Sequence, residues 1–339
     1  MKISLVDQPV QLAFHPSEGE ILFIGLINGH VNGFKGETCI WNYKKIKGSI
    51  RVLKWISPGE LWIVSSEGLL RVFHFDQQTC EMKLTKKLRG LHDEEPITSV
   101  CALEGAEIAT GDDSGCIKIW NKETFKCTRT YRFNGDFIAD MRYLPGKKML
   151  FAVSGDGSLA VYNIKKDELV AQSDNFDDEY HTLEFVLGEK KLVCFSPSGF
   201  ADVYLWDFWG KLTDRITTES NDDEEGGFSV DSVCKYSEST LIAGCSDGKI
   251  RTFTFPKGVY STGIVENSSE MPVEGLAISA DLLHVASISH DNCVTVWSID
   301  EILAEQDQHE QQQPLKSKQS SRKKAKKQQE SNDFFADLL

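Results

Sequence analysis

The stretch Gly115-Cys116-Ile117-Lys118-Ile119-Trp120 holds the pattern that decides the fold. A glycine marks a turn, and a short alternating strand follows it and ends on an aromatic residue. The same spacing recurs from Gly29 to Phe34, Gly68 to Phe73, Gly157 to Tyr162 and Gly248 to Phe253, with Asn292 to Trp297 and a longer Gly199 to Trp206. The seven closing aromatics are Phe34, Phe73, Trp120, Tyr162, Trp206, Phe253 and Trp297, and they lie 39, 47, 42, 44, 47 and 44 residues apart.

This period is close to the ~40–45 residues of a WD40-type blade. We therefore predict an all-β protein, a seven-bladed WD40 β-propeller over residues 1–300, with a disordered tail over residues 301–339. Each unit reads as four short strands, in the third Ile97–Leu103, Glu107–Thr110, Cys116–Trp120 and Lys126–Arg132. The last unit lacks a fourth strand. Residues 2–6 are expected to complete it and close the ring, because a closed ring leaves no open sheet edge.

The turn residues follow the WD repeat only in part. Asp156-Gly157, Asp247-Gly248 and Asp291-Asn292 match its Asp-Gly turn, and His92 stands where the motif has its histidine. Ser287, Ser289 and Trp297 occupy the positions of its hydrogen-bonding partners in the last unit. Where such polar partners are missing, we expect packing to replace them.

The net charge of −14 is carried by residues 1–300, which hold 30 Lys and Arg against 44 Asp and Glu. An acidic body repels phosphate and favours basic protein partners. No apolar run approaches the ~20 residues of a membrane helix, and a charge interrupts the N-terminus before a signal-peptide core can form. We expect a soluble, intracellular, monomeric propeller without a membrane partner.

Motifs for catalysis are missing from the sequence, which has no nucleophile elbow, P-loop or HExxH. Gly155-Asp156-Gly157 and Gly111-Asp112-Asp113 resemble phosphate or metal loops but fall on strand-to-strand turns. The nine cysteines include no C-x-x-C pair and are expected to be buried thiols. The sequence predicts no enzyme activity, cofactor or metal.

Three acidic clusters each precede an inner strand, and in a propeller such connections emerge on one face. We predict an acidic rim that docks a basic protein tail; ordinary loop solubility is the alternative. Its residues are Asp93, Glu94, Glu95, Asp177, Asp178, Glu179, Asp222, Asp223, Glu224 and Glu225.

The last forty residues change character. The basic run Lys316–Lys327 has no apolar periodicity and is typical of a disordered nuclear localisation signal or of a segment that contacts RNA. The residues expected to carry nuclear import are Arg322, Lys323, Lys324, Lys326 and Lys327. The chain then ends on Phe334, Phe335 and Leu338 within an otherwise polar segment, which predicts a short linear motif for a partner.

Several stretches resemble the WD repeat-containing protein 55 family and its fungal counterparts. The resemblance is carried by Ile108–Gly115, Phe137–Met141, Ser154–Leu159, Pro272–Ser279 and Asn332–Leu338. Phe-Ile-Ala-Asp-Met and the Phe-Phe-Ala-Asp-Leu terminus are the most specific of these. The resemblance implies a non-enzymatic scaffold in the nucleus, mainly the nucleolus, that supports ribosomal RNA production and large-subunit assembly. Its implied partners are pre-ribosomal assembly factors or ribosomal proteins with basic segments.

The alternative function is a substrate receptor of a cullin-RING ubiquitin ligase. Such receptors use a Trp-Asp-x-Arg motif at a blade end. Here Trp206-Asp207-Phe208-Trp209 has tryptophan in place of arginine, and Trp120-Asn121-Lys122-Glu123 lacks both Asp and Arg. A protein that binds RNA through its tail alone is a third reading.

Overall fold

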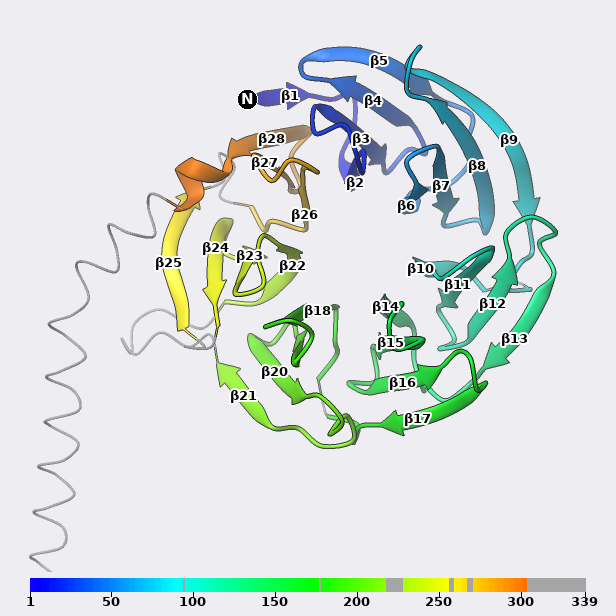
Figure 1. Cartoon of the computed structure of the whole chain (residues 1–339). Helices are drawn as coiled ribbons and strands as arrows, with labels where there is room; N and C mark the ends of the chain where they lie inside the picture. The colour runs from blue at the N-terminus through cyan, green and yellow to red at the C-terminus, as the bar shows by residue number, and fades with distance from the viewer. Residues whose placement is uncertain (94, 177, 218–227, 256–258, 267–270, 304–339) are drawn as a thin grey trace, which may run out of the picture.

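Seven four-stranded antiparallel sheets form a closed ring in the computed structural model (Figure 1). The structure describes the chain except residues 94, 177, 218–227, 256–258, 267–270 and 304–339, and omits the side chains of residues 259–266 and Thr217. In each sheet the order in space follows the order in the chain, and only the last blade takes a strand from elsewhere. The predicted seven-bladed all-β propeller is confirmed; the tail beyond residue 303, predicted to be disordered, lies outside the described residues.

Each blade runs from an inner strand at the channel to an outer strand at the rim. Blades 1 and 2 are β2 (Pro9–Phe14), β3 (Ile21–Leu26), β4 (Val31–Lys35), β5 (Thr38–Tyr43) and β6 (Ile50–Ser57), β7 (Glu60–Ser65), β8 (Leu69–Asp76), β9 (Glu81–Arg89). Blades 3 and 4 are β10 (Ile97–Ala102), β11 (Glu107–Asp112), β12 (Ile117–Asn121), β13 (Cys127–Tyr131) and β14 (Ile138–Leu144), β15 (Met149–Ser154), β16 (Leu159–Asn163), β17 (Glu168–Gln172). Blades 5 and 6 are β18 (Thr182–Val186), β19 (Lys191–Phe195), β20 (Phe200–Leu205), β21 (Asp214–Thr217) and β22 (Val230–Lys235), β23 (Thr240–Cys245), β24 (Lys249–Thr254), β25 (Val259–Glu266).

Blade 7 joins the two ends of the propeller. It consists of β26 (Gly275–Ile278), β27 (His284–Ile288), β28 (Cys293–Ser298) and, as its outer strand, β1 (Lys2–Ser4) from the N-terminus. Ile3 pairs with Val294, is 7% exposed, and packs with Leu22 and Ile24 of blade 1. The strand is shorter than the predicted residues 2–6, because pairing ends at Ser4.

The closing aromatic of blade 5 is Tyr204, so the prediction of Trp206 was wrong. Tyr204 is fully buried and pairs with Leu192 of β19, as Tyr162 pairs with Leu150 in blade 4. Trp206 follows the end of β20 and is half-buried. Tyr204 stands five residues after Gly199, so the regular spacing holds in this blade as well.

Glycines at the turns between the second and third strands hold neighbouring blades together. Gly115 has a φ of +79°, which favours glycine. A Cβ there would lie 2.5 Å from the carbonyl oxygen of Asn134 and 2.6 Å from that of Asp136. The turn therefore presses against the backbone that leads into blade 4, and only glycine fits.

A short helical turn over residues 299–303 ends the described chain. Ile299 and Ile302 are buried there, in a cluster with Val273 and Val285 of the last blades. Within the described part of the chain, the helical structure is far too short to cross a bilayer.

Candidate protein-docking face

One face of the ring carries the connections into the inner strands and the turns between the second and third strands. Strand direction reverses three times within a blade, so the connection into each inner strand lies at the same end as the turn between the second and third strands. The contact of Gly115 with the connection over Asn134–Asp136 shows this directly. Gly157 repeats it, since a Cβ there would lie 2.3 Å from the carbonyl oxygen of Asp178. The connections that carry the first and second predicted acidic clusters lie on this face, and the third cluster lies outside the described residues.

Blade 3 is fastened at this face by a chain of buried hydrogen bonds. His92 Nδ1 lies 2.5 Å from Asp112 Oδ2, and His92 Nε2 lies 2.6 Å from Thr110 Oγ1. Trp120 donates its indole N–H to Thr110 Oγ1 at 2.7 Å. Because the carboxylate can only accept, His92 Nδ1 donates to Asp112. The prediction that His92 is the motif histidine is confirmed.

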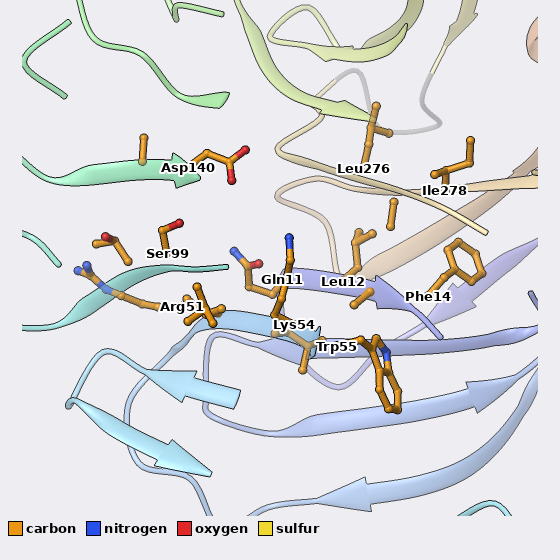
Figure 2. A pocket seen from close by; sticks show the side chains of 17 residues that line it. Gln11, Leu12, Phe14, Arg51, Lys54, Trp55, Ser99, Asp140, Leu276 and Ile278 are labelled. Atoms are coloured by element: carbon orange, nitrogen blue, oxygen red, sulfur yellow. The ribbon is translucent and has the colours of Figure 1, made fainter. Parts of the chain in front are cut away.

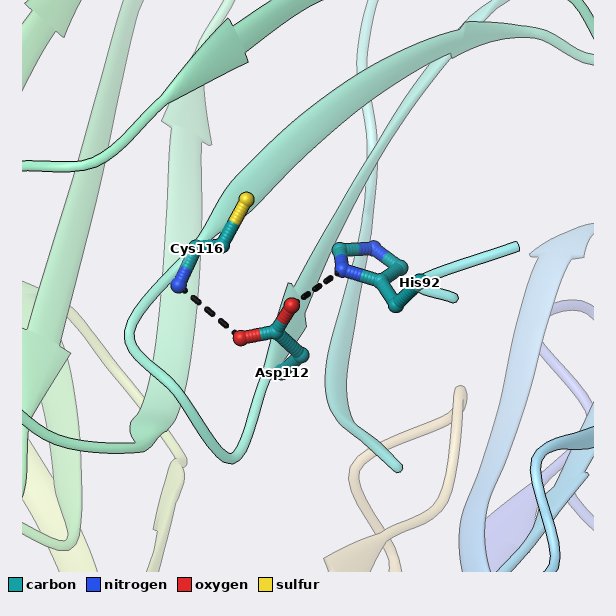
Figure 3. A group of neighbouring side chains, drawn as sticks. All are labelled: His92, Asp112 and Cys116. Carbon is teal, nitrogen blue, oxygen red and sulfur yellow. Dashed lines mark hydrogen bonds and ion pairs between the residues drawn. The ribbon is translucent and has the colours of Figure 1, made fainter. Parts of the chain in front are cut away.

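The carboxylate of Asp112 is held in its charged form. Burial alone would raise its pKa, but hydrogen bonds from His92, Ser114 and the backbone of Cys116 outweigh burial, so the pKa is lowered. Both oxygens are in use, one toward His92 and one toward the backbone of Cys116 (Figure 3). The second oxygen also accepts from the Ser114 hydroxyl.

His92, Asp112 and Cys116 place potential metal-binding atoms within 4.8 Å of one another. The chemistry of these atoms does not suit a cation. Both nitrogens of His92 and both oxygens of Asp112 are already hydrogen-bonded. Burial raises the pKa of the Cys116 thiol, whereas a metal ligand must be a thiolate. The His92–Asp112–Cys116 cluster therefore stabilises blade 3 through its hydrogen bonds.

Blades 5 and 6 use arginine–aspartate pairs instead. Arg215 Nε and Nη2 donate to the two oxygens of Asp202 at 2.6 and 2.7 Å, and the Tyr180 hydroxyl donates to Asp202 at 2.5 Å. In blade 6, Arg251 donates to both oxygens of Asp247 at 2.7 and 2.6 Å. The expectation that packing alone replaces the missing motif partners was wrong for these blades. In blade 7 the predicted partners meet: Trp297 donates to Ser287 at 2.9 Å.

The first acidic cluster projects from the connection into blade 3. Asp93 has an 84% exposed side chain and lies 3.3 Å from the ammonium of Lys118. Glu95 is exposed. Both side chains are therefore placed where a partner could reach them.

The second cluster lies in the connection into blade 5 and divides into two roles. Asp178 accepts hydrogen bonds from the hydroxyls of Ser196 and Ser198, which ties it to the facing turn of blade 5. Glu179 is 52% exposed and lies 3.5 Å from His181. Glu179 is thus available to a partner, whereas Asp178 is a fastening residue.

The other predicted site residues lie outside the described part of the chain. They are Glu94, Asp177, Asp222, Asp223, Glu224 and Glu225 of the rim, and Arg322, Lys323, Lys324, Lys326, Lys327, Phe334, Phe335 and Leu338 of the tail.

Sequence reasoning missed carboxylates that the turns bring to the same face. Glu67, from the turn between β7 and β8, lines a groove of about 550 Å³ together with Asp93 and Glu95. Asp136 is exposed in the connection into blade 4. Glu67-Gly68 occupies the turn position of Asp156-Gly157, so alignment of the units could have found it.

The central channel is a second hollow, with a cavity of about 400 Å³ between inner strands (Figure 2). Its lining mixes apolar and polar groups, including Leu12, Leu276, Lys54, Ser99 and Asp140. Asp140 pairs with Arg142 at 2.7 Å, and Arg142 reaches Glu184 of blade 5 at 3.2 Å. These pairs link the inner strands β14 and β18.

The arginine position of a ligase-receptor motif is taken by a core residue. Trp209 is 2% exposed and contacts Phe151 and Trp206, each with ring centroids 5.0 Å apart. An apolar ring in this place cannot supply the cation that the motif requires.

The ring of four-stranded blades and the His92–Asp112–Thr110–Trp120 chain define a WD40 β-propeller, a class whose members are generally non-enzymatic scaffolds for protein–protein interactions. The chain belongs to the WD repeat-containing protein 55 family. It is 30% identical over 300 residues to WD repeat-containing protein 55 of Bos taurus, covering 86% of this chain and 75% of that one. It is 28% identical over 310 residues to the Arabidopsis thaliana protein of that name, covering 89% and 84%.

A fungal relative is WD repeat-containing protein JIP5 of Cryptococcus neoformans, 28% identical over 316 residues, with 89% of this chain and 82% of that one covered. Among solved structures, Chaetomium thermophilum Raptor is similar with a TM-score of 0.73 and 16% identity. The match covers 88% of this chain and 28% of Raptor, and it shows the fold alone. No family model matches the chain.

Proposed function

We propose that this protein is a nucleolar scaffold that supports ribosome biogenesis, in ribosomal RNA synthesis or processing and large-subunit assembly, by docking proteins with basic segments. The observation that carries the docking is the gathering of Glu67, Asp93, Glu95 and Glu179 on one face of the ring. A field of one sign steers an oppositely charged partner to the face that bears it. The nucleolar setting rests on family resemblance and on the basic tail.

The docking face is tested with a five-residue rim variant of the full chain. It carries Asp93→Asn, Glu94→Gln, Glu95→Gln, Asp177→Asn and Glu179→Gln, and it leaves Asp178 in place because of its serine hydrogen bonds. A matched control changes five exposed carboxylates at turns of the opposite face to Gln: Glu18, Glu37, Glu81, Glu123 and Glu189.

Affinity purification from cell extract then compares the three proteins. We expect the rim variant, and not the control, to lose ribosomal proteins and assembly factors. The wild-type association should weaken with salt, since the Debye length falls from ~10 Å at 0.1 M to ~3 Å at 1 M. Equal recovery by all three proteins would contradict docking at this face. Recovery of a ubiquitin-ligase adaptor would favour the alternative function.

The nuclear address is tested separately. Replacing Arg322, Lys323, Lys324, Lys326 and Lys327 with alanine removes five of the seven positive charges after residue 300. We expect a folded protein that no longer concentrates in the nucleolus of imaged cells. If the variant still concentrates in the nucleolus, another segment carries the nuclear localisation signal.

A further inference from the structure

A basic surface lies where the outer parts of blades 1 and 2 meet, beside the carboxylates Glu67, Asp93 and Glu95 of the acidic face. We propose that this surface binds single-stranded nucleic acid. Its cations are Lys44, Lys45, Arg71, Lys87 and Arg89, here called the basic edge patch. Four of them are exposed and Arg71 is half-buried. They come from the end of blade 1 and from β8 and β9 of blade 2.

Packing places these cations on one surface. Tyr43, the last residue of β5, contacts Phe73 of β8 with ring centroids 5.0 Å apart. Arg71 lies two residues before Phe73 and therefore points to the same side of blade 2, toward blade 1. Lys87 pairs directly with Arg71 across the sheet, and Arg89 follows on the same side, about 7 Å along β9. Lys44 and Lys45 continue the chain from Tyr43.

Two like charges stand opposite each other in this patch. Arg71 and Lys87 are cross-strand partners, an arrangement that destabilises a sheet when nothing neutralises it. Among the described residues, none of the five cations forms an ion pair with a carboxylate, although Arg89 shares a groove with Glu67 and Glu95. Within the described chain, no ion pair therefore neutralises the facing Arg71 and Lys87, and an anion from outside could do so.

Protection of the open edge does not explain the patch. Lysines on an outer strand prevent edge-to-edge pairing, and Lys87 could serve that purpose. Arg71, however, lies on β8, which is paired on both sides, and Lys44 and Lys45 follow the end of β5 (Figure 1).

Aromatic side chains beside the cations favour nucleic acid over an acidic peptide. Trp41 and Tyr43 stack on each other with their planes 10° apart and ring centroids at 5.6 Å, and both are half-buried. Aromatic rings that take up bases beside cations that follow the phosphates are the usual means of binding single strands. The two arginines add forked donors that suit phosphate oxygens.

The test uses the full chain and fluorescein-labelled U20 RNA, with anisotropy measured at 50–300 mM KCl. Because the tail could also bind RNA, every comparison is repeated with Arg322, Lys323, Lys324, Lys326 and Lys327 changed to alanine. The patch variant changes Lys44, Lys45, Arg71, Lys87 and Arg89 to Gln. A milder variant changes only Lys44, Lys45 and Lys87, should the first fold poorly. The control changes five exposed lysines elsewhere to Gln: Lys35, Lys126, Lys165, Lys190 and Lys211.

We expect the patch variant to bind U20 at least about tenfold more weakly at low salt, with the control within about twofold of the parent. Each lost phosphate contact lowers the slope of log K against log salt by about 0.7, so the slope should fall by about 2 to 3. Arg71→Lys with Arg89→Lys should keep the slope. Equal losses in patch variant and control would overturn the proposal. So would a parent that binds a 20-residue oligoglutamate but not U20.

Discussion

Blades 3 and 5 reach the same architecture with different fastenings. Blade 3 places His92 and Thr110 between one carboxylate and an indole. Blade 5 buries Asp202 completely and neutralises it with Arg215, whose guanidinium also lies 5.1 and 4.8 Å from the ring centroids of Phe176 and Phe200. The two carboxylates occupy different positions, since Asp112 ends the second strand of its blade whereas Asp202 lies on the third strand, where blade 3 has Lys118.

The two arrangements fail differently when a partner is removed. The hydrogen-bonded chain of blade 3 loses one hydrogen bond at a time, each worth about 1 kcal/mol. In blade 5 only the carboxylate is buried, and loss of the exposed Arg215 leaves that buried charge uncompensated, which costs more. The following predictions test this difference, and all use the free energy of unfolding from denaturant titration except where another measurement is named.

The largest effect is expected for Arg215→Met. Methionine keeps apolar contact with Phe176 and Phe200 but strands the carboxylate of Asp202, which is 0% exposed. The free energy of unfolding should fall by about 3–5 kcal/mol. The exposed neighbour Lys211→Met is the control, and the double variant Arg215→Met with Asp202→Leu should recover part of the loss. A loss of unfolding free energy below about 1 kcal/mol would show that the Arg215–Asp202 pair does not stabilise the blade.

Asp112→Asn tests the carboxylate of blade 3, and we expect a loss of about 1.5–3 kcal/mol at neutral pH. The pKa of Asp112 is lowered in the folded state, so its contribution is present above the unfolded value of about 3.9 and is lost as pH falls through the folded value. Wild-type stability should therefore fall more steeply than that of the variant from about pH 5 downward. Parallel curves would assign the acid sensitivity to other carboxylates.

Trp120→Phe removes one hydrogen bond from the chain of blade 3. The variant loses the indole hydrogen bond to Thr110 but leaves His92 bonded to it, so the loss should be about 1–2 kcal/mol. Trp206→Phe deletes the same atoms from a half-buried ring outside the sheet and serves as the comparison. Equal losses of unfolding free energy at the two sites would mean that the smaller side-chain volume, and not the lost hydrogen bond, causes the destabilisation.

The smallest effect belongs to the five-residue rim variant described above. Exposed charges contribute little to folding, so its stability should stay within about 0.5 kcal/mol of wild type. Adding Asp178→Asn should cost more, because that carboxylate accepts from Ser196 and Ser198. If the five-residue variant melts several degrees lower, the rim fastens the ring as His92 and Arg215 do.

Sequence reasoning located the strands well and the side-chain partners less well. The turn glycines set the repeat, and the aromatic position follows from them by counting. Trp206 was predicted for blade 5 with a longer spacing, although Tyr204 keeps the regular five residues from Gly199. His92 could be recognised since its place relative to the next strand is part of a known motif.

Sequence by itself determined the seven units, their all-β character and the acidic balance of residues 1–300, because turns and alternation are local and charge is additive. Only the tertiary structure decided which charges meet. Arg215 reaches Asp202 from thirteen residues away, and Arg71 meets Lys87 across a sheet. It also separated Asp178, held by serines, from Glu179, which is exposed. Pairing of this kind depends on strand register and on contact between blades, and local sequence determines neither of them.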